Sequence, residues 1–172
     1  MEITEQDRFV DACRRLAGKG LTLWNPGVVH KQAKVIEECA GKCDVGGWLS
    51  QGHSVSAYET NVEDALAGAR EWPWIRIRAE VARPQDCDMV ILANGGAPRL
   101  APEWLPHAKY AIVAGDGTDG SLESEIIMAG HNVIDELKIG VRTVYLSRRS
   151  ESPAVDSPNP KSSELKMAEV SA

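Results

Sequence analysis

The stretch Lys109-Tyr-Ala-Ile-Val-Ala-Gly-Asp-Gly-Thr-Asp-Gly120 decides the fold of this chain. Its apolar run up to Ala114 predicts a buried strand. The glycines that follow predict a tight loop, and apolar residues at helical spacing from Ser121 onward predict a helix. Val141-Arg-Thr-Val-Tyr-Leu146 predicts the next strand. A strand, a glycine-rich loop and a helix N-terminus in this order form the usual ligand-binding corner of an open α/β sheet.

Four carboxylates lie in this corner, those of Asp116, Asp119, Glu123 and Glu125. A helix dipole favours anions at the helix N-terminus, but the carboxylates already fill that role, so a bare phosphate is disfavoured. A hydroxyl-rich sugar, a cationic group or a metal fits better, and a carboxylate here can serve as nucleophile or general base. A purely structural interpretation stays open, in which Asp119 and Ser121 cap the helix and the glutamates complement its dipole.

Strand-like and helix-like patterns alternate along the rest of the chain. Helices are expected over residues 4–17, 30–40 and 61–70 and from Ser121 through His131, and strands over residues 21–24 and 88–93. The alternating apolar residues of Ile75–Val81 fit either a strand or the start of a helix. Residues 94–109 hold three prolines and are expected to be irregular.

This alternation is typical of a single doubly wound, Rossmann-like α/β domain, in which helices cover both faces of a parallel sheet. We expect the domain to span residues 1–149 and the Ser-, Pro-, Glu- and Lys-rich residues 150–172 to form a disordered tail. A ligand of such a fold binds at the carboxyl ends of the strands. The segments expected there are Asn25-Pro26-Gly27, Asn94-Gly95-Gly96 and the loop from Asp116 through Thr118 to Ser121.

Composition excludes several classes of protein. The net charge of -6 over 172 residues leaves no electrostatic footprint for nucleic acid. No apolar run approaches the length of a membrane span, and the acidic start is unlike a signal peptide, so a cytoplasmic protein is expected. The four cysteines lack the spacing of a zinc site and are expected to be buried, reduced thiols.

Four pieces of sequence carry a resemblance to one enzyme family: Leu21-Thr-Leu-Trp-Asn-Pro-Gly-Val-Val29, residues 77–91, Asp119-Gly-Ser-Leu-Glu-Ser-Glu-Ile-Ile-Met-Ala129 and Gly140-Val-Arg-Thr-Val-Tyr-Leu146. The third is similar to an Asp-x-(Gly/Ser)-x-x-x-Glu-(Leu/Ile)-x-x-Ala motif that carries a catalytic glutamate. In this order the pieces resemble the nucleoside 2-deoxyribosyltransferases and their relatives, the 2'-deoxynucleoside 5'-phosphate N-hydrolases.

The resemblance implies a role for each matching residue. Glu125 is implied as the nucleophile that attacks C1' of the sugar, and Asp119 as the group that orients the sugar or protonates the leaving base. Glu80 is implied to contact the base or sugar, and Ser121 a 5'-phosphate or 5'-hydroxyl. The remaining strand-end residues complete the expected substrate site for a small nucleoside or nucleotide: Asn25, Gly27, Asn94, Asp116 and Thr118. No cofactor is required for such a reaction.

Two departures from the family pattern support a second hypothesis. Glu123 stands where the family has a glycine, and Trp24 narrows the loop before Pro26. These residues fit a non-catalytic module for nucleotide sensing or protein interaction on the same fold.

Assembly into a homo-oligomer, most simply a dimer, is also expected. Trp72, Trp74 and Trp104 lie in or beside segments that contain proline, and such rings are enriched at interfaces. The family resemblance implies oligomers as well.

Overall fold

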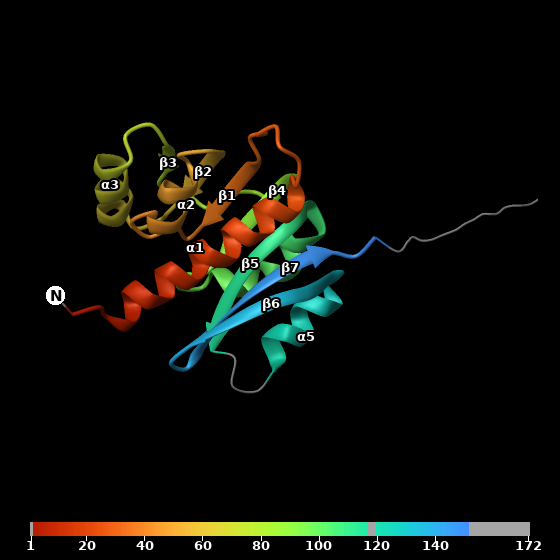
Figure 1. Ribbon diagram of the computed structural model, residues 1–172. Helices are drawn as coiled ribbons and strands as arrows, with labels where there is room; N and C mark the ends of the chain where they lie inside the picture. The colour runs from red at the N-terminus through yellow and green to blue at the C-terminus, as the bar shows by residue number, and fades with distance from the viewer. Residues whose placement is uncertain (1, 117–119, 152–172) are drawn as a thin grey trace, which may run out of the picture.

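One seven-stranded sheet organises the chain (Figure 1), and its strand order is β3-β2-β1-β4-β5-β7-β6. The computed structural model describes residues 2–116 and 120–151. The strands are β1 (Lys34–Glu38), β2 (Ser54–Tyr58), β3 (Arg76–Arg78), β4 (Cys87–Leu92), β5 (Ala108–Asp116), β6 (His131–Ile139) and β7 (Arg142–Arg149). The predicted single, doubly wound α/β domain is confirmed. The expected tail lies outside the described residues, save for Ser150 and Glu151.

The sheet is parallel except at one strand. β3, β2, β1, β4 and β5 pair in parallel, and β7 is antiparallel to both of its neighbours, β5 and β6. β6 therefore runs in the same direction as β5, and β7 is inserted between them. A hairpin at Gly140, which has a left-handed φ of 61°, joins β6 to β7.

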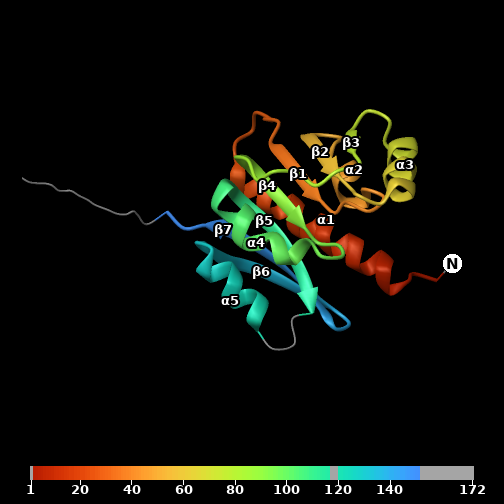
Figure 2. The same ribbon diagram turned by 180° about the vertical axis from the view of Figure 1, so that it is seen from behind.

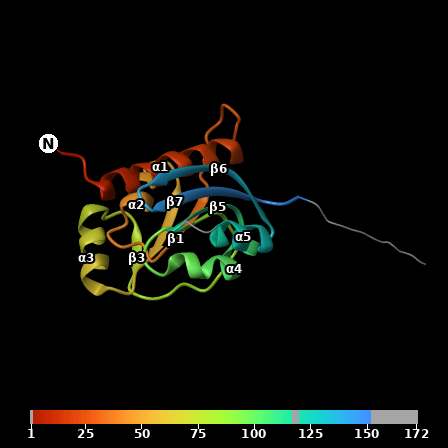
Figure 3. The same ribbon diagram turned by 90° about the horizontal axis from the view of Figure 1, so that it is seen from below.

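The helices lie in two layers. α1 (Glu5–Trp24) and the short α2 (Asp44–Leu49) cover one face of the sheet, while α4 (Ala101–Trp104) and α5 (Ser121–Met128) cover the other. Figure 3 shows the sheet between these two layers, with α3 (Val62–Glu71) near the edge strand β3. Two 3-10 turns flank α4, at Ala97–Leu100 and Leu105–His107.

Alternating side chains of the strands fill two separate cores. Met89 and Ile91 of β4 belong to the core beneath α1, whereas Val90 and Leu92 belong to the core beneath α4 and α5. Both sets are almost fully buried. A strand covered on both faces shows no alternation of apolar and polar residues in its sequence, as expected for the interior of a parallel sheet.

The sequence-based assignment was wrong at the first helix and the first strand. The predicted strand over residues 21–24 is the end of α1, and the predicted helix over residues 30–40 contains β1. Gly20 lies within α1 and does not end it. A Cβ at this position would lie 2.7 Å from a methyl carbon of Met89, so the glycine allows the helix to pack closely against the sheet. The start of the first helix was predicted correctly, and there Thr4 caps α1 and forms a capping box with Asp7.

The predicted helix through His131 was also wrong, because α5 ends at Met128 and His131 begins β6. His131 is fully buried, and its Nδ1 lies 2.9 Å from the Ser147 hydroxyl of β7. Its Nε2 donates to the carbonyls of Leu105 and Ala108, at 2.7 and 3.0 Å. Burial lowers the pKa of His131, and the ring ties the antiparallel edge to the turn before β5.

The segment 94–109, expected to be irregular, contains α4 and its two flanking 3-10 turns. Four other assignments are confirmed. β4, β5, β7 and α3 lie where strands and a helix were predicted, and Asn61 caps α3 by accepting the Asp64 N–H at 3.0 Å. The ambiguous segment Ile75–Val81 contains the short strand β3. Among the described residues, no helix combines the length and the apolar character needed to cross a membrane.

The tryptophans are distributed differently from the expectation for an interface. Trp104 is 1% exposed and lies in the core beneath α4, so it cannot be an interface residue. Trp72 is half-buried and packs against α2, and Trp74 remains exposed while its Nε1 donates to Ser50 Oγ at 2.7 Å. The homo-oligomer stays a prediction.

The contact between Trp72 and α2 yields a test of the fold. A Cβ at Gly47 would lie 2.2 Å from the Trp72 ring, which cannot yield like a flexible side chain. We expect Gly47→Ala to lower the free energy of unfolding by roughly 1–3 kcal/mol, as overpacking does. Gly18→Ala in α1 is the control, because nothing lies within 4 Å of its new Cβ. Alanine there should raise stability by roughly 0.5–1 kcal/mol. Urea denaturation measures both, and equal effects of the two variants would contradict the packing described.

Candidate functional site

The segments that follow the parallel strands meet at one edge of the sheet, which we call the carboxyl edge. The loop Cys39–Cys43 follows β1, Glu59 follows β2, and Asn94 follows β4. Glu59 is close to the loop, because its Oε1 accepts the Gly41 N–H at 2.7 Å and its Oε2 accepts the Asn61 N–H at 2.7 Å. The ends of β1 and β2 are thereby joined through one carboxylate.

The residues predicted as a nucleoside site are not brought together. Asn94 and Asp116 lie at the carboxyl edge, after β4 and at the end of β5. Asn25 and Gly27 lie between α1 and β1, at the opposite edge, where the parallel strands begin.

The remaining predicted residues are scattered as well. Glu80 is exposed beyond β3, and Ser121 and Glu125 are exposed on α5. Thr118 and Asp119 lie outside the described residues.

The loop after β1 has an unusual backbone. Cys39, Gly41 and Cys43 all have left-handed φ values, of 54°, 59° and 62°. This conformation favours glycine, and a side chain there costs on the order of 1 kcal/mol or more. Backbone bonds hold the loop in place: Ala40 N–H donates to the Tyr58 carbonyl at 2.9 Å, and Cys43 N–H donates to the Ala40 carbonyl at 2.8 Å.

A buried carboxylate lies beneath this loop. Glu37 is 1% exposed, and its Oε1 accepts the Gly46 N–H at 2.9 Å and lies 3.5 Å from Cys43 Sγ. Its Oε2 is buried without a hydrogen-bond partner. Burial raises the pKa of Glu37 to about 7, since the ionised form loses its hydration.

Glu38 behaves in the same way on the other face of β1. It is 2% exposed, and its Oε2 accepts the Ala82 N–H at 2.9 Å. Burial raises the pKa of Glu38 as well, partly offset by its backbone hydrogen bonds.

A hollow of about 260 Å³ opens at the carboxyl edge, between the N-terminal half of α1 and the strand-end loops. We call it the carboxyl-edge hollow. Its charged lining residues are one cation, Lys42, and two anions, Asp44 and Asp64. The other lining residues are Gln6, Phe9, Val10, Ala40, Gly41, Val45 and Asn94. The part of the chain that the structure describes has no group of three or more His, Cys, Asp or Glu side chains placed to hold a metal ion.

Sequence reasoning predicted Asn94 but missed the loop after β1 and Glu59. One signal in the sequence was available. Glu59 follows the loop by about 20 residues, at the end of the next strand, which is where dinucleotide-binding folds place the carboxylate that binds a ribose. The loop itself could not be recognised from the sequence, because two of its three left-handed positions are occupied by cysteines, Cys39 and Cys43, instead of glycines.

No protein-family model matches the chain, and no curated protein matches it. Solved structures of methyltransferases do match. Ribosomal protein L11 methylase from Lactobacillus delbrueckii subsp. bulgaricus has a TM-score of 0.64 at 14% identity, covering 80% of this chain and 78% of that one.

Two further matches were solved with ligands. The magnesium protoporphyrin IX methyltransferase of Synechocystis PCC 6803, with bound SAM, has a TM-score of 0.63 at 11% identity and covers 80% and 79% of the two chains. The 1,6-didemethyltoxoflavin-N1-methyltransferase of Burkholderia thailandensis, with bound 1,6-didemethyltoxoflavin and S-adenosylhomocysteine, has a TM-score of 0.58 at 16% identity and covers 81% of this chain and 79% of that one. The chain therefore has the fold of these methyltransferases.

These matches overturn the functional predictions made from the sequence. The resemblance to nucleoside 2-deoxyribosyltransferases was wrong, and with it the assignment of an N-glycosidic-bond enzyme with Glu125 as nucleophile. The physical reason is placement: those predicted residues that the structure describes lie at both edges of the sheet and on α5, so they form no common site. The alternative, a non-catalytic module for nucleotide sensing or protein interaction, receives no support from the matched proteins either.

The buried carboxyl of Glu37 predicts how stability depends on pH. Its pKa rises from 4.5 to about 7 on folding, so the folded state retains a proton that the unfolded state releases between these values. Stability should therefore fall as pH rises from about 4.5 to 7, by about 3 kcal/mol in total. Glu37→Gln keeps an acceptor for Gly46 and should remove this part of the pH dependence.

Urea unfolding of wild type and Glu37→Gln at several pH values between 4.5 and 8 measures the difference. Glu125→Gln, at an exposed position on α5, is the matched control and should follow the wild-type curve. If the free energies of unfolding of wild type and Glu37→Gln differ by the same amount at every pH, the burial of an ionisable Glu37 is contradicted.

Proposed function

We propose that this chain binds S-adenosylmethionine at the carboxyl edge of its sheet and acts as a methyltransferase. The observation that carries the proposal is the left-handed loop Cys39–Cys43, which is hydrogen-bonded to the carboxylate of Glu59, directly after the next strand. The matched methyltransferases of known structure, two of them solved with SAM or S-adenosylhomocysteine, support it.

The charges of the hollow fit this cofactor. S-adenosylmethionine carries a sulfonium and an ammonium cation and one carboxylate, so its net charge is positive. The carboxyl-edge hollow is lined by the opposite set, two aspartates and one lysine. Asp44 and Asp64 suit the cations, and Lys42 suits the carboxylate. At about 260 Å³ the hollow is slightly smaller than typical ligand pockets, so it suits the amino-acid part of the molecule.

Glu59 suits the ribose. Each of its oxygens accepts one backbone N–H, and a carboxylate oxygen has room for a second hydrogen bond. The two hydroxyls of a ribose are donors of the right kind. The backbone of Gly41 also leaves space for a close approach, because a Cβ there would meet only Asn94 Nδ2, at 3.8 Å.

The chemistry divides between the cofactor and the protein. S-adenosylmethionine supplies an electrophilic methyl group on its sulfonium. Asp44 and Asp64 would stabilise the positive charge of the bound cofactor, and Glu59 would orient its ribose. Asn94 holds its place through Nδ2, which donates to the Ala40 carbonyl at 3.5 Å. Its Oδ1 can accept a hydrogen bond from an N–H or O–H nucleophile and so orient a methyl acceptor.

The test is titration calorimetry of the purified chain with S-adenosylmethionine and S-adenosylhomocysteine. We expect saturable binding of both, and Glu59→Gln should weaken it at least about tenfold, because an amide loses the negative charge and one acceptor. Methyl transfer is read as release of S-adenosylhomocysteine when a fraction of cellular metabolites is added.

Glu125→Gln is the control for this experiment. It removes the same charge from an exposed position on α5 and should bind the cofactor as the wild type does. A circular dichroism melt of each variant verifies folding. Absence of both heat and thermal stabilisation at about 1 mM of either ligand would reject the proposal.

A further inference from the structure

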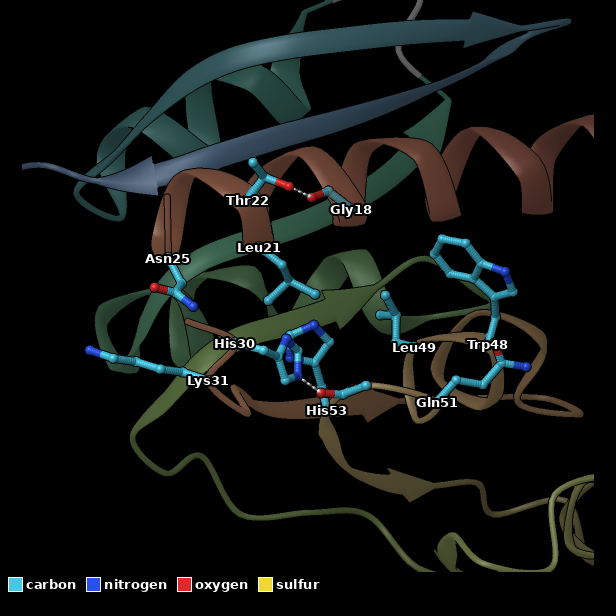
Figure 4. A pocket seen from close by; sticks show the side chains of 11 residues that line it. Gly18, Leu21, Thr22, Asn25, His30, Lys31, Trp48, Leu49, Gln51 and His53 are labelled. Atoms are coloured by element: carbon cyan, nitrogen blue, oxygen red, sulfur yellow. Dashed lines mark hydrogen bonds between the residues drawn. The ribbon is translucent and has the colours of Figure 1, made fainter. Parts of the chain in front are cut away.

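A second pocket lies at the opposite edge of the sheet, where β1 and β2 begin. Its volume is about 290 Å³, and it is lined by α1, by the segment before β1, by the end of α2 and by the segment between α2 and β2. Figure 4 shows the rings of His30 and His53 side by side at its centre, below Leu21 of α1. We call it the amino-edge pocket. None of the residues proposed to hold S-adenosylmethionine lines it.

The pocket is lined without a single carboxylate. Its charged or titratable lining residues are Lys31, His30 and His53, and its other polar side chains include Thr22, Trp48 and Gln51. The chain as a whole carries a net charge of -6, and the carboxyl-edge hollow is lined by two aspartates. A locally positive pocket in an acidic protein favours an anionic ligand. Within the described residues, Lys31 makes no ion pair, so its charge is available.

Hydrogen bonds orient both histidine rings and define their tautomers. The Ala33 N–H donates to Nδ1 of His53 at 3.0 Å, so the neutral ring carries its proton on Nε2 and offers an N–H donor there. Nε2 of His30 lies 2.6 Å from the Gly52 carbonyl, which can only accept, so this nitrogen is protonated too. Both rings are held in place by the backbone before any ligand binds.

The two rings lie close together. Their centroids are 5.2 Å apart, and burial together with the neighbouring His30 lowers the pKa of His53. An anion in the pocket would accept a hydrogen bond from the free Nε2–H of the neutral His53 ring. Trp48, which is 40% exposed, adds an aromatic surface at the rim.

We propose that the amino-edge pocket is a binding site for a small molecule that carries an oxyanion, a carboxylate or a phosphate. Lys31 supplies the charge, the N–H of His53 donates to the oxyanion, and Trp48 packs against the remainder of the ligand. The pocket lies at the far end of β1 from the carboxyl-edge hollow, so it does not hold the methyl acceptor. The proposal is therefore independent of the proposed function.

The test follows the histidine ring signals by nuclear magnetic resonance while inorganic phosphate or sodium benzoate is added at constant ionic strength. The two probes separate a phosphate site from an aromatic carboxylate site. We expect at least one of them to shift the signals of His30 and His53 with a saturable curve, while those of His107 and His131 stay unchanged. Lys31→Gln, an exposed position that should not affect folding, should weaken the binding at least about threefold.

Two controls make the result decisive. His107→Gln removes a half-buried histidine from the same edge outside the pocket and should leave binding unchanged. Choline chloride, a cation, should shift neither ring. The proposal is overturned if neither anion gives a saturable shift, if choline acts as the anions do, or if Lys31→Gln and wild type bind equally.

Discussion

Two buried carboxylates at the end of β1 hold the elements on both faces of the sheet. Glu37 and Glu38 are consecutive, so their side chains point to opposite faces, and each accepts a backbone N–H from the segment that covers its face. Glu37 binds the start of α2 at Gly46, and Glu38 binds Ala82 in the connection between β3 and β4. Burying two carboxyls is costly unless they are hydrogen-bonded, and these bonds orient the segments that shape the carboxyl edge. The loop Cys39–Cys43 begins directly after this pair and ends directly before α2.

The fold could be predicted from the sequence where the local signals were strong. β4 and β5 are long apolar runs bounded by turn residues, and Asn61 is a good cap for α3. The prediction of β1 failed for a physical reason. The strand is buried on both faces and contains two glutamates, so its sequence shows neither an alternation of apolar and polar residues nor an apolar run. The end of α1 was predicted too early because Gly20 resembled a helix-terminating glycine, although this glycine allows close packing against Met89.

The site could be predicted only in part. The rule that ligands bind at strand carboxyl ends correctly selected Asn94 and Asp116, which do lie at that edge. The rule failed for Asn25, because residues 21–24 were predicted to form a strand and are the last turn of helix α1. Glycine-rich sequence drew attention to the loop after β5, whereas the loop with three left-handed residues follows β1 and has cysteine at two of them. Backbone strain of that kind is visible in φ values and not in residue types, so no pattern of glycines marked it.

The carboxyl-edge hollow and the amino-edge pocket lie far apart, so their charges are expected to interact only weakly. β1 spans Lys34–Glu38, and at about 3.3 Å per residue a strand of this length separates its first and last residues by about 13 Å. Charges at the two edges are thus further apart than the Debye length of about 8 Å at physiological ionic strength, so they interact weakly through solvent. The acidic lining at one edge and the carboxylate-free lining at the other can therefore coexist without one cancelling the other. Substitutions in the two hollows share no partner and should add in their effects on stability. An interaction energy well above about 0.5 kcal/mol between Lys31→Gln and Glu59→Gln would instead require coupling through β1 itself, whose buried glutamates are the groups placed to transmit it.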